Sequence, residues 1–286
     1  MFSLRTRDDA AAIAGALDSL LATGRPLVVV GGGFVGLEVA STARSKGVTV
    51  TVLEGLPRLM ARSVSATISD FYADLHRRHG VDVRLATTVA GLAVERGAVS
   101  DVRLGDGTVL PAGAVVVGVG AQPETRLAQA AGVECAGGIV VDVDSRTSVP
   151  GVVAAGDCTV TRLADGSLRR LESVQSAVEQ ARAAATALLG RSRPFTATPW
   201  FWSRQFDAKL EFAGLAPDAD TEVVRGDPTS GSFSVFRYAG ERLRAVDSVN
   251  ATAEHRAARK MLDAGVRPTP AQAADPGFDL AGVLAG

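Results

Sequence analysis

Val28-Val29-Val30-Gly31-Gly32-Gly33-Phe34-Val35-Gly36-Leu37-Glu38 is the stretch that decides the fold of this 286-residue chain. A short run of valines leads into a glycine turn, and the residues after the turn have helical spacing. The valine run is typical of a parallel strand that is buried on both faces. The stretch therefore predicts a strand, a turn and a helix, which together open a nucleotide-binding α/β unit.

Each glycine of the turn has a separate physical role. Gly31 lets the chain turn sharply, Gly33 leaves room for a pyrophosphate, and Gly36 lets the helix pack closely on the strand. The phosphates would lie at the start of the helix, where unpaired N–H groups and the helix dipole favour negative charge. The residues predicted to bind the dinucleotide here are Gly31, Gly33, Phe34, Val35 and Gly36.

A second apolar run, Val48 to Leu53, ends at Glu54, 21 residues after Gly33. A carboxylate at this place would accept the ribose hydroxyls of NAD and repel the additional phosphate of NADP. The sequence therefore predicts a preference for NADH. Arg58 and Arg62 follow closely and could weaken that preference.

The rest of the first 123 residues completes an α/β unit. Apolar residues at helical spacing predict a helix before the glycine turn, with Ile13, Leu17, Leu20 and Leu21 on one face, and a second helix that ends at Gly80. Strands are predicted at 81–85 and 114–119. Between them, the runs 87–95, 98–104 and 108–110 predict an inserted antiparallel meander, because Asp106-Gly107 is a strong hairpin turn.

The remaining residues predict two further parts. Residues 124–193 should contain a helix at 125–131, strands at 139–142 and 152–155, a hairpin at 165–166 and a helix at 172–189. The apolar residues of that last helix are expected to face inward: Val174, Ala177, Val178, Ala181, Ala185 and Leu188. From Trp200 onward, alternating runs at 210–212, 222–225, 233–238 and 243–249, followed by a helix at 252–264, predict an antiparallel α+β module.

Two features of these later parts allow more than one interpretation. Asp157 follows a predicted strand, where ligands bind in α/β sheets, although it could simply cap the turn. Trp200 and Trp202 have strand spacing, which fits either ordinary packing or an aromatic platform for a cofactor.

The composition excludes several classes of protein. The chain is 47% hydrophobic and 21% charged, with a net charge of −1, so a soluble, cytoplasmic protein with a sizeable core is expected. A nucleic-acid binder would normally have a basic face, and none is evident. The first residues lack the apolar centre of a signal peptide, and no apolar run approaches the roughly 18 residues of a membrane helix.

The histidines and cysteines do not predict a metal site. His76 and His79 are three residues apart on one helix, but a solvated face is favoured over a metal site because no third ligand is apparent. Cys135 and Cys158 form no CxxC pair and are expected to be buried, unpaired thiols. His255 lies in a basic helix and is expected to be exposed.

Six motifs, in this order along the chain, resemble the FAD-dependent NADH:ferredoxin reductases of the putidaredoxin reductase type, in the pyridine nucleotide-disulfide oxidoreductase superfamily. The motifs are Leu4-Arg5-Thr6, Val30 to Glu38, Gly118-Val119-Gly120-Ala121-Gln122-Pro123, Ala154-Ala155-Gly156-Asp157-Cys158, Glu172-Ser173-Val174 and Pro199-Trp200-Phe201-Trp202-Ser203. The resemblance implies an α/β fold with a Rossmann-like NADH domain and its inserted β-meander at 1–123. The second segment of an FAD domain would follow at 124–193, and a C-terminal α+β interface domain at 194–286.

The resemblance also implies roles for individual residues. Arg5 would reach the FAD diphosphate, Asp157 the ribityl chain, and Val174 the flavin ring through its backbone. Glu172, in the motif Glu172-Ser173-Val174, and Gly120, in the motif Gly118 to Pro123, are also expected to bind a cofactor. Trp202 would lie beside the isoalloxazine and Glu38 near the nicotinamide, so these two are the residues expected at the reaction centre. The family's lysine partner for this glutamate lies in the first FAD segment, so Glu38 is expected to be unpaired. Arg204 and Glu124 depart from the Asp and Asn common in relatives.

The implied activity is hydride transfer from NADH to FAD, followed by single-electron transfer to a ferredoxin-type [2Fe-2S] protein. An acidic ferredoxin could dock on a group of arginines, although scattered solvated charge would have the same composition: Arg162, Arg169, Arg170, Arg191, Arg193 and Arg204. In that family a first FAD segment precedes the residues that match Phe2, so an N-terminally shortened protein is expected, and FAD binding is in question. The alternative is a non-catalytic NAD-binding module or remnant that no longer holds FAD.

Overall fold

The first part of the fold is a four-stranded parallel sheet, seen in a computed structural model that describes residues 1–284. The strand order is β3-β2-β1-β7, and all neighbouring strands are parallel. The strands are β1 (Leu27–Val30), β2 (Val50–Leu53), β3 (Asp82–Arg84) and β7 (Ala114–Val117). The predicted buried parallel strands are therefore confirmed.

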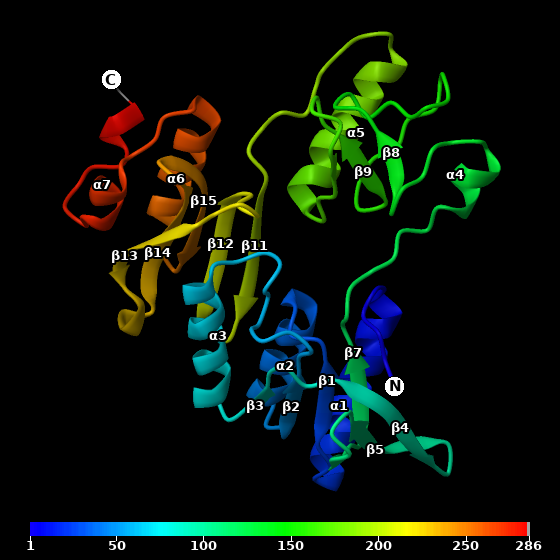
Figure 1. Cartoon of the computed structure of the whole chain (residues 1–286). Helices are drawn as coiled ribbons and strands as arrows, with labels where there is room; N and C mark the ends of the chain where they lie inside the picture. The colour runs from blue at the N-terminus through cyan, green and yellow to red at the C-terminus, as the bar shows by residue number, and fades with distance from the viewer. Residues whose placement is uncertain (285–286) are drawn as a thin grey trace.

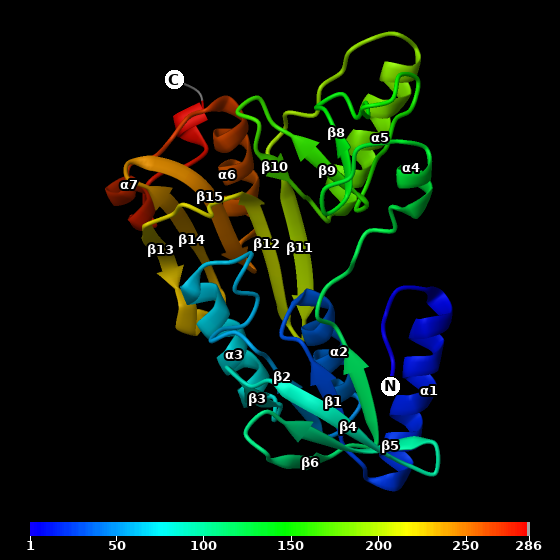
Figure 2. The same ribbon diagram turned by 45° about the vertical axis from the view of Figure 1, so that its right-hand side comes forward.

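Helices cover one face of this sheet and a small antiparallel sheet covers the other (Figures 1 and 2). Val29 packs in the core on the helical side, whereas Val28 packs against the small sheet, so the strands are apolar on both faces. The helices are α1 (Arg7–Thr23), α2 (Phe34–Ser45) and α3 (Ala66–Arg78). The small sheet consists of β4 (Val89–Glu95), β5 (Ala98–Leu104) and β6 (Val109–Pro111), as the meander prediction required.

The C-terminal part is a five-stranded antiparallel sheet of order β11-β12-β15-β14-β13. Its strands are β11 (Trp200–Gln205), β12 (Ala208–Gly214), β13 (Thr221–Asp227), β14 (Ser232–Ala239) and β15 (Arg242–Val249). The short helices η1 (Pro228–Ser230) and η2 (Gly282–Leu284) and the helices α6 (Thr252–Ala264) and α7 (Pro270–Ala274) complete this part. Phe236 packs on the side of α6 and α7, whereas Leu210 and Phe233 join the core of the parallel sheet. The first and last parts of the chain therefore share one hydrophobic core.

The middle part contains α4 (Arg126–Ala130), β8 (Ile139–Val141), β9 (Thr159–Arg162), β10 (Leu168–Arg169) and α5 (Val174–Leu188). Strand β9 pairs in parallel with β8, and it forms the predicted hairpin with β10. Two segments without regular structure, residues 118–125 and 189–199, connect this part to the others (Figure 1). The domain limits at 123/124 and 193/194 stay predictions.

The strand predicted at 152–155 is wrong. Only an isolated bridge between Arg146 and Val153 is present. The chain has just turned at Gly151, whose φ of 80° is left-handed, and the N–H of Val152 bonds back to the carbonyl of Val149 at 3.1 Å. The residues after this turn bond back to 145–147, through the N–H of Thr147 to the carbonyl of Val152 and the N–H of Ala154 to the carbonyl of Ser145, and this contact is too short to form a strand.

The inward apolar face predicted for α5 is also wrong. Val174, Val178 and Leu188 are 60%, 42% and 60% exposed. The buried residues of the helix are small or polar: Ser176, Gln180, Ala183 and Ala184. The Gln180 amide oxygen accepts hydrogen bonds from the N–H of Gly156 and the hydroxyl of Thr159, which fixes this face against the sheet of β8, β9 and β10. The larger apolar residues consequently lie on the outward face.

The environments of two histidines differ from the predictions. His76 is fully buried beside Phe206, with ring centroids 5.1 Å apart, and His255 is 2% exposed beside Trp200. Sequence spacing missed both because their partners come from a distant part of the chain. Cys135 and Cys158 are free but only partly buried, so their predicted burial is wrong.

Two classes of feature are not found in the described part of the chain. Within residues 1–284, no three His, Cys, Asp or Glu side chains are grouped so as to hold a metal ion. Over the same residues, no helix combines the length and apolar character needed to cross a bilayer.

Candidate functional site

The glycine turn lies where β1 and β7 diverge, at the point where the strand order of the parallel sheet reverses. Gly31 has a φ of 109°, and a Cβ built on it would be 2.5 Å from the carbonyl oxygen of Gly118. A Cβ on Gly36 would collide with the carbonyl oxygen of Gly31. Both positions therefore require glycine for steric reasons.

Gly33 is different, because a Cβ there would meet nothing within 4 Å. Gly33 is the N-cap of α2 and provides no side chain to satisfy the first N–H groups of the helix. Among the described residues, no protein acceptor is recorded for the N–H groups of Phe34 and Val35. Open space beside unpaired N–H groups at a helix start suits a pyrophosphate.

Glu54 is tied to the glycine turn. Its carboxylate accepts hydrogen bonds from the N–H groups of Gly32, at 2.6 Å, and Leu56, at 2.8 Å. An ionised carboxylate has about four lone-pair sites, so acceptor capacity remains for ligand hydroxyls. The predicted ribose-binding residue thus also holds the turn in shape.

The guanidinium of Arg58 is already engaged within the protein. It donates to the carbonyl oxygens of Ala61 and Val64 and to the hydroxyl of Ser69. It therefore stabilises the loop before α3, and a phosphate would have to break these bonds to use it. Arg62 is exposed.

Glu38, on α2, has a partner from the C-terminal sheet. Its Oε1 accepts a 2.6 Å hydrogen bond from the hydroxyl of Ser203 on β11. The expectation that this carboxylate is unpaired is therefore wrong. Side chains on a helix point toward its N-terminus, so Glu38 lies on the side of the glycine turn.

Strand β11 presents different chemistry on its two faces. Phe201 packs against Phe34 of α2, with ring centroids 4.9 Å apart, and Ser203 bonds to Glu38 from the same face. The alternate residues Trp200 and Trp202 form the other face, with ring centroids 5.4 Å apart. Successive residues of a strand point to opposite sides, so one strand contacts both α2, the helix that follows the glycine turn, and a second candidate site.

That second site is a hollow of about 420 Å³ between β11 and the start of α5. Gln175 spans the junction, because its amide donates to the carbonyl of Thr198 and accepts from the N–H of Trp200. Trp202 is 40% exposed and lines the hollow together with Val174. An aromatic face and apolar side chains suit a planar ring system, and the charged residues of the lining are Glu179, Asp263 and Arg259.

The other residues singled out from the sequence are more dispersed. Asp157 is exposed in the turn before β9, and Gly120 has a φ of 113° in the segment that leaves β7. Glu172 pairs with Arg170 at 3.1 Å. Arg5 is exposed before α1, and its N–H bonds to Asp9 at 3.1 Å. The roles assigned to these residues by resemblance stay predictions.

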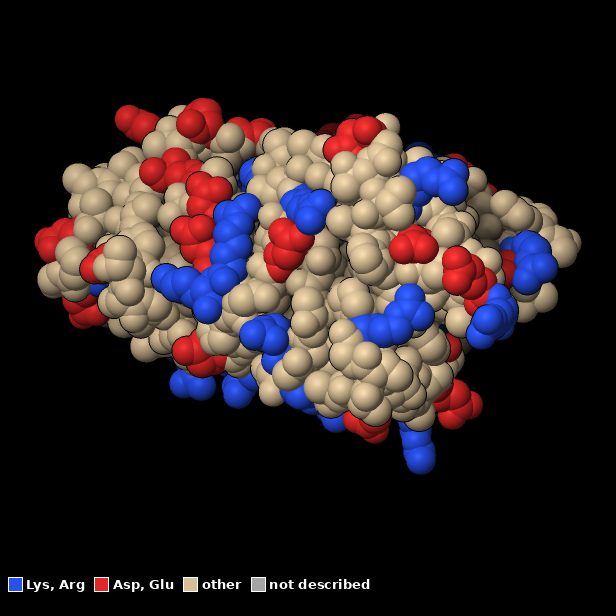
Figure 3. All heavy atoms as spheres, turned by 90° about the horizontal axis from the view of Figure 1, so that it is seen from below, with Lys and Arg blue, Asp and Glu red and all other residues tan. Residues whose placement is uncertain are grey.

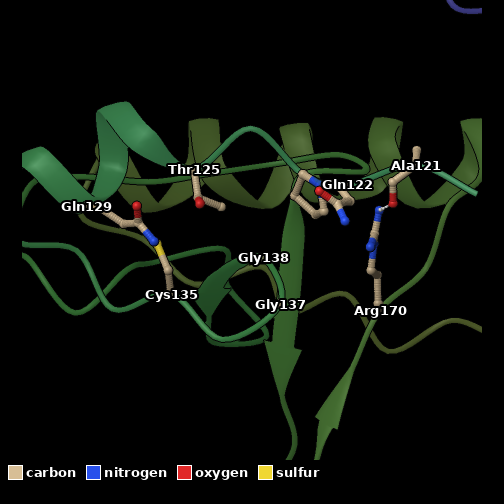
Figure 4. A pocket seen from close by; sticks show the side chains of 9 residues that line it. Ala121, Gln122, Thr125, Gln129, Cys135, Gly137, Gly138 and Arg170 are labelled. Atoms are coloured by element: carbon tan, nitrogen blue, oxygen red, sulfur yellow. Dashed lines mark hydrogen bonds between the residues drawn. The ribbon is translucent and has the colours of Figure 1, made fainter.

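A smaller hollow of about 370 Å³ lies where the segment after β7 passes the middle part (Figure 4). Gln129 and Cys135 lie at one end of it and Arg170 at the other. The guanidinium of Arg170 donates to the carbonyl of Ala121 at 3.2 Å. This arginine therefore fastens the connecting segment to β10.

The surface charge is mixed. On the face in Figure 3, acidic and basic side chains are interspersed. Arg162, Arg170 and Arg193 pair with Glu134, Glu172 and Glu179. Half of the arginines considered as a docking face are thus neutralised locally.

Three site residues were missed by sequence reasoning. Ser203 ends the motif Pro199-Trp200-Phe201-Trp202-Ser203 but had no role of its own there. No local pattern marks Gln175, or Gln205, which donates to Ser203 from the same strand. Only the strand alternation from Trp200 onward could have placed Ser203 opposite Trp202.

Comparison with known proteins identifies the same family that the sequence motifs resemble, over most of the chain. A family described as pyridine nucleotide-disulphide oxidoreductase matches residues 1–181, and one described as reductase C-terminal matches residues 200–284. Rhodocoxin reductase of Rhodococcus erythropolis is 46% identical over 268 residues, which are 93% of this chain and 63% of that protein. The ferredoxin–NAD(+) reductase component of the anthranilate 1,2-dioxygenase system of Burkholderia cepacia is 40% identical, over 93% of this chain and 66% of that protein.

Solved structures agree. The ferredoxin reductase for the CYP199A2 system of Rhodopseudomonas palustris matches with a TM-score of 0.94 and 41% identity, over 99% of this chain and 69% of that one. The covalent putidaredoxin reductase–putidaredoxin complex matches with a TM-score of 0.92 and 38% identity, over 99% of this chain and 68% of that one. The chain spans about 63% of the length of rhodocoxin reductase. It belongs to the pyridine nucleotide-disulphide oxidoreductase family, among the ferredoxin reductases of the putidaredoxin and rhodocoxin reductase type.

Proposed function

We propose that this chain binds NADH at the glycine turn and forms one wall of a flavin site, as part of an NADH:ferredoxin oxidoreductase. The observation that carries the proposal is the two-faced strand β11, which contacts Glu38 through Ser203 on one side and offers Trp202 on the other. Nicotinamide and flavin must lie close together for hydride transfer, and one strand that contacts both sites would fix their separation.

The preference for NADH rests on Glu54 and Arg58. The Glu54 carboxylate faces the turn and has acceptor capacity left for ribose hydroxyls. One candidate to neutralise a 2′-phosphate, Arg58, already donates to four oxygens of the protein. A phosphate at this place would meet the Glu54 carboxylate, and Arg58 could neutralise it only by giving up these bonds. Arg62, which is exposed, is the other cation of this loop.

The hollow beside Trp202 fits part of a flavin. FAD bound there would accept a hydride from NADH and release electrons singly to an iron–sulfur protein. The chain's own residues would bind and orient: Trp202 would stack on the ring, and the first N–H groups of α5 would favour negative charge on it. We assign Asp157, Glu172 and Arg5 to the remaining contacts with FAD by resemblance, and Gly120 to cofactor binding. Residues 1–284 contain one glycine fingerprint, which this proposal gives to NADH.

A ferredoxin-type [2Fe-2S] protein is the proposed electron acceptor. Putidaredoxin reductase, one of the similar proteins of known structure, was solved as a covalent complex with putidaredoxin. The proposed functional units are the NADH domain at 1–123, the second FAD segment at 124–193 and the interface domain at 194–286.

The test is a pair of titrations of the purified chain with NADH and with FAD. Calorimetry should detect one NADH site, and bound FAD should show flavin absorption bands that NADH bleaches. A second candidate function, an NAD-binding module without turnover, is favoured by the exposure of the flavin wall, where Val174 is 60% exposed. NADH binding without any flavin binding would select that candidate, and absence of NADH binding would overturn both.

A further inference from the structure

A line of four polar side chains runs from the glycine-turn helix into the core between the first and last parts of the chain. Glu38 Oε1 accepts from Ser203 Oγ at 2.6 Å, and Ser203 Oγ accepts from the amide nitrogen of Gln205 at 3.1 Å. The amide oxygen of Gln205 lies 2.9 Å from Nε2 of His76. Ser203, Gln205 and His76 are each at most 1% exposed. Three elements, α2, β11 and α3, therefore meet through a buried hydrogen-bonded chain.

The chain of hydrogen bonds has one self-consistent direction. A serine hydroxyl has a single hydrogen, and a carboxylate can only accept, so Ser203 must donate to Glu38. Gln205 must then donate to Ser203 through its amide nitrogen, which turns its oxygen toward His76. With the amide reversed, Ser203 would have to donate to Gln205, and its oxygen would face the Glu38 carboxylate without a hydrogen between them.

The direction of these hydrogen bonds also determines the tautomer of the His76 imidazole. Nε2 must carry the hydrogen that is donated to Gln205, which leaves Nδ1 without a hydrogen in the neutral ring. Nδ1 is buried and has no hydrogen-bond partner among the described residues. Burial also lowers the pKa of His76, which favours the neutral ring.

We propose that Ser203 is a positioning residue for Glu38, and that Gln205 and His76 fix the direction of its hydroxyl hydrogen. The C-terminal strand thereby sets the orientation of the carboxylate beside the nicotinamide end of the dinucleotide. This inference rests on the proposed NADH binding. A fixed carboxylate would accept a hydrogen bond from an N–H donor of the ligand, such as the nicotinamide carboxamide, because it cannot rotate away.

The principal test compares NADH with ADP-ribose, which lacks the nicotinamide, by calorimetry on the full chain. Ser203→Ala should weaken NADH binding by about fivefold to tenfold and change ADP-ribose binding by less than about twofold, as expected for one misplaced charged acceptor. Ser203→Thr keeps the hydroxyl and should restore the wild-type ratio. In a Glu38→Gln background, Ser203→Ala should have no further effect on the ratio.

Ser234→Ala is the matched control. Ser234 is a fully buried serine in the same sheet that bonds to Ser248 and Glu254, away from Glu38. It should leave the NADH to ADP-ribose ratio as in the wild type. An unchanged ratio in Ser203→Ala, or an equal change in Ser234→Ala, would overturn the positioning role while NADH binding by the wild type upholds the proposed function. A wild type that binds no NADH would overturn both.

A second measurement needs no variant. The chain contains three histidines, so long-range nitrogen–proton NMR spectra can report each tautomer. His76 should be neutral at pH 7 with its hydrogen on Nε2. A hydrogen on Nδ1 would reverse the direction of the hydrogen-bonded chain and overturn the inference.

Discussion

The hydroxyl of Ser203 reaches Glu38 across 165 positions of sequence, at 2.6 Å. This bond joins the helix that begins at the glycine turn to the first strand of the C-terminal sheet. The two parts are held together elsewhere as well, because Asp247 and Glu222 of the C-terminal sheet accept hydrogen bonds from N–H groups of Ser65 and Ala66 at the start of α3. The glycine turn with its helix and the C-terminal sheet therefore form one structural unit.

Glu54→Gln should weaken NADH binding by about tenfold and reduce the preference for NADH over NADPH. The amide keeps one oxygen and cannot accept from both Gly32 and Leu56, and it no longer repels a phosphate. Calorimetry with both dinucleotides measures the two effects. Glu95→Gln, at the exposed end of β4, is the control and should leave both affinities unchanged. Wild-type selectivity in Glu54→Gln would refute the role of this carboxylate.

Gly36→Ala should abolish detectable NADH binding and lower the melting temperature. The added methyl group would collide with the carbonyl oxygen of Gly31 and force α2 away from β1. Gly15→Ala in α1 is the matched control, since a Cβ there meets nothing within 4 Å. It should stabilise the protein by about 0.5–1 kcal/mol through helix propensity. Normal NADH binding by Gly36→Ala would show that the turn tolerates the displacement.

Asp247→Ala should reduce the free energy of unfolding by about 3 kcal/mol, because it removes one partner of a buried pair. Asp247 is fully buried, 3.8 Å from Arg237, and it accepts the N–H of Ser65. Urea unfolding followed by tryptophan fluorescence and by far-ultraviolet circular dichroism should give one common transition that moves to lower urea. Asp218→Ala, which removes an exposed pair with Arg244, should cost at most about 0.5 kcal/mol. Two separate transitions would contradict the shared core.

The stability that the neutral imidazoles of His76 and His255 contribute should fall as the pH decreases below about 6.5. Burial lowers the pKa of both His76 and His255 in the folded state. The unfolded chain therefore binds protons at a higher pH than the folded chain, and acid favours unfolding. Urea midpoints between pH 8 and 5.5 should show a smaller slope in His76→Gln and in His255→Gln than in the wild type. Wild-type slopes in both variants would contradict this account.

Local sequence patterns predicted the parallel sheet, the meander and the glycine turn because their causes are local. Alternation, helical spacing and the steric needs of glycine act over a few residues, so Gly31 and Gly36 could be placed without knowing the rest of the fold. The same reasoning placed Glu54 at the end of its strand.

The patterns failed where a side chain is satisfied by a distant part of the chain. His76 of α3 is buried by Phe206 and Gln205, and Glu38 of α2 is paired by Ser203. None of these partners lies on the helix of the residue that it contacts. On α5, helical spacing identified an apolar stripe correctly as a stripe. It could not show that the small and polar residues beside that stripe, Ser176, Gln180, Ala183 and Ala184, would be the ones buried against the sheet of β8, β9 and β10.

The alternation along β11 has a consequence for how relatives of this chain can vary in length. Inserting or deleting one residue between Trp200 and Gln205 would exchange the two faces of β11. Tryptophan would then point at α2, and serine would point at the hollow now lined by Trp202 and Val174. The segment 189–199 before it has no regular structure, so a change of length there would leave the alternation of β11 intact. Sequences that diverge by insertion should therefore do so before Trp200, and chimaeras between relatives should be joined in 189–199.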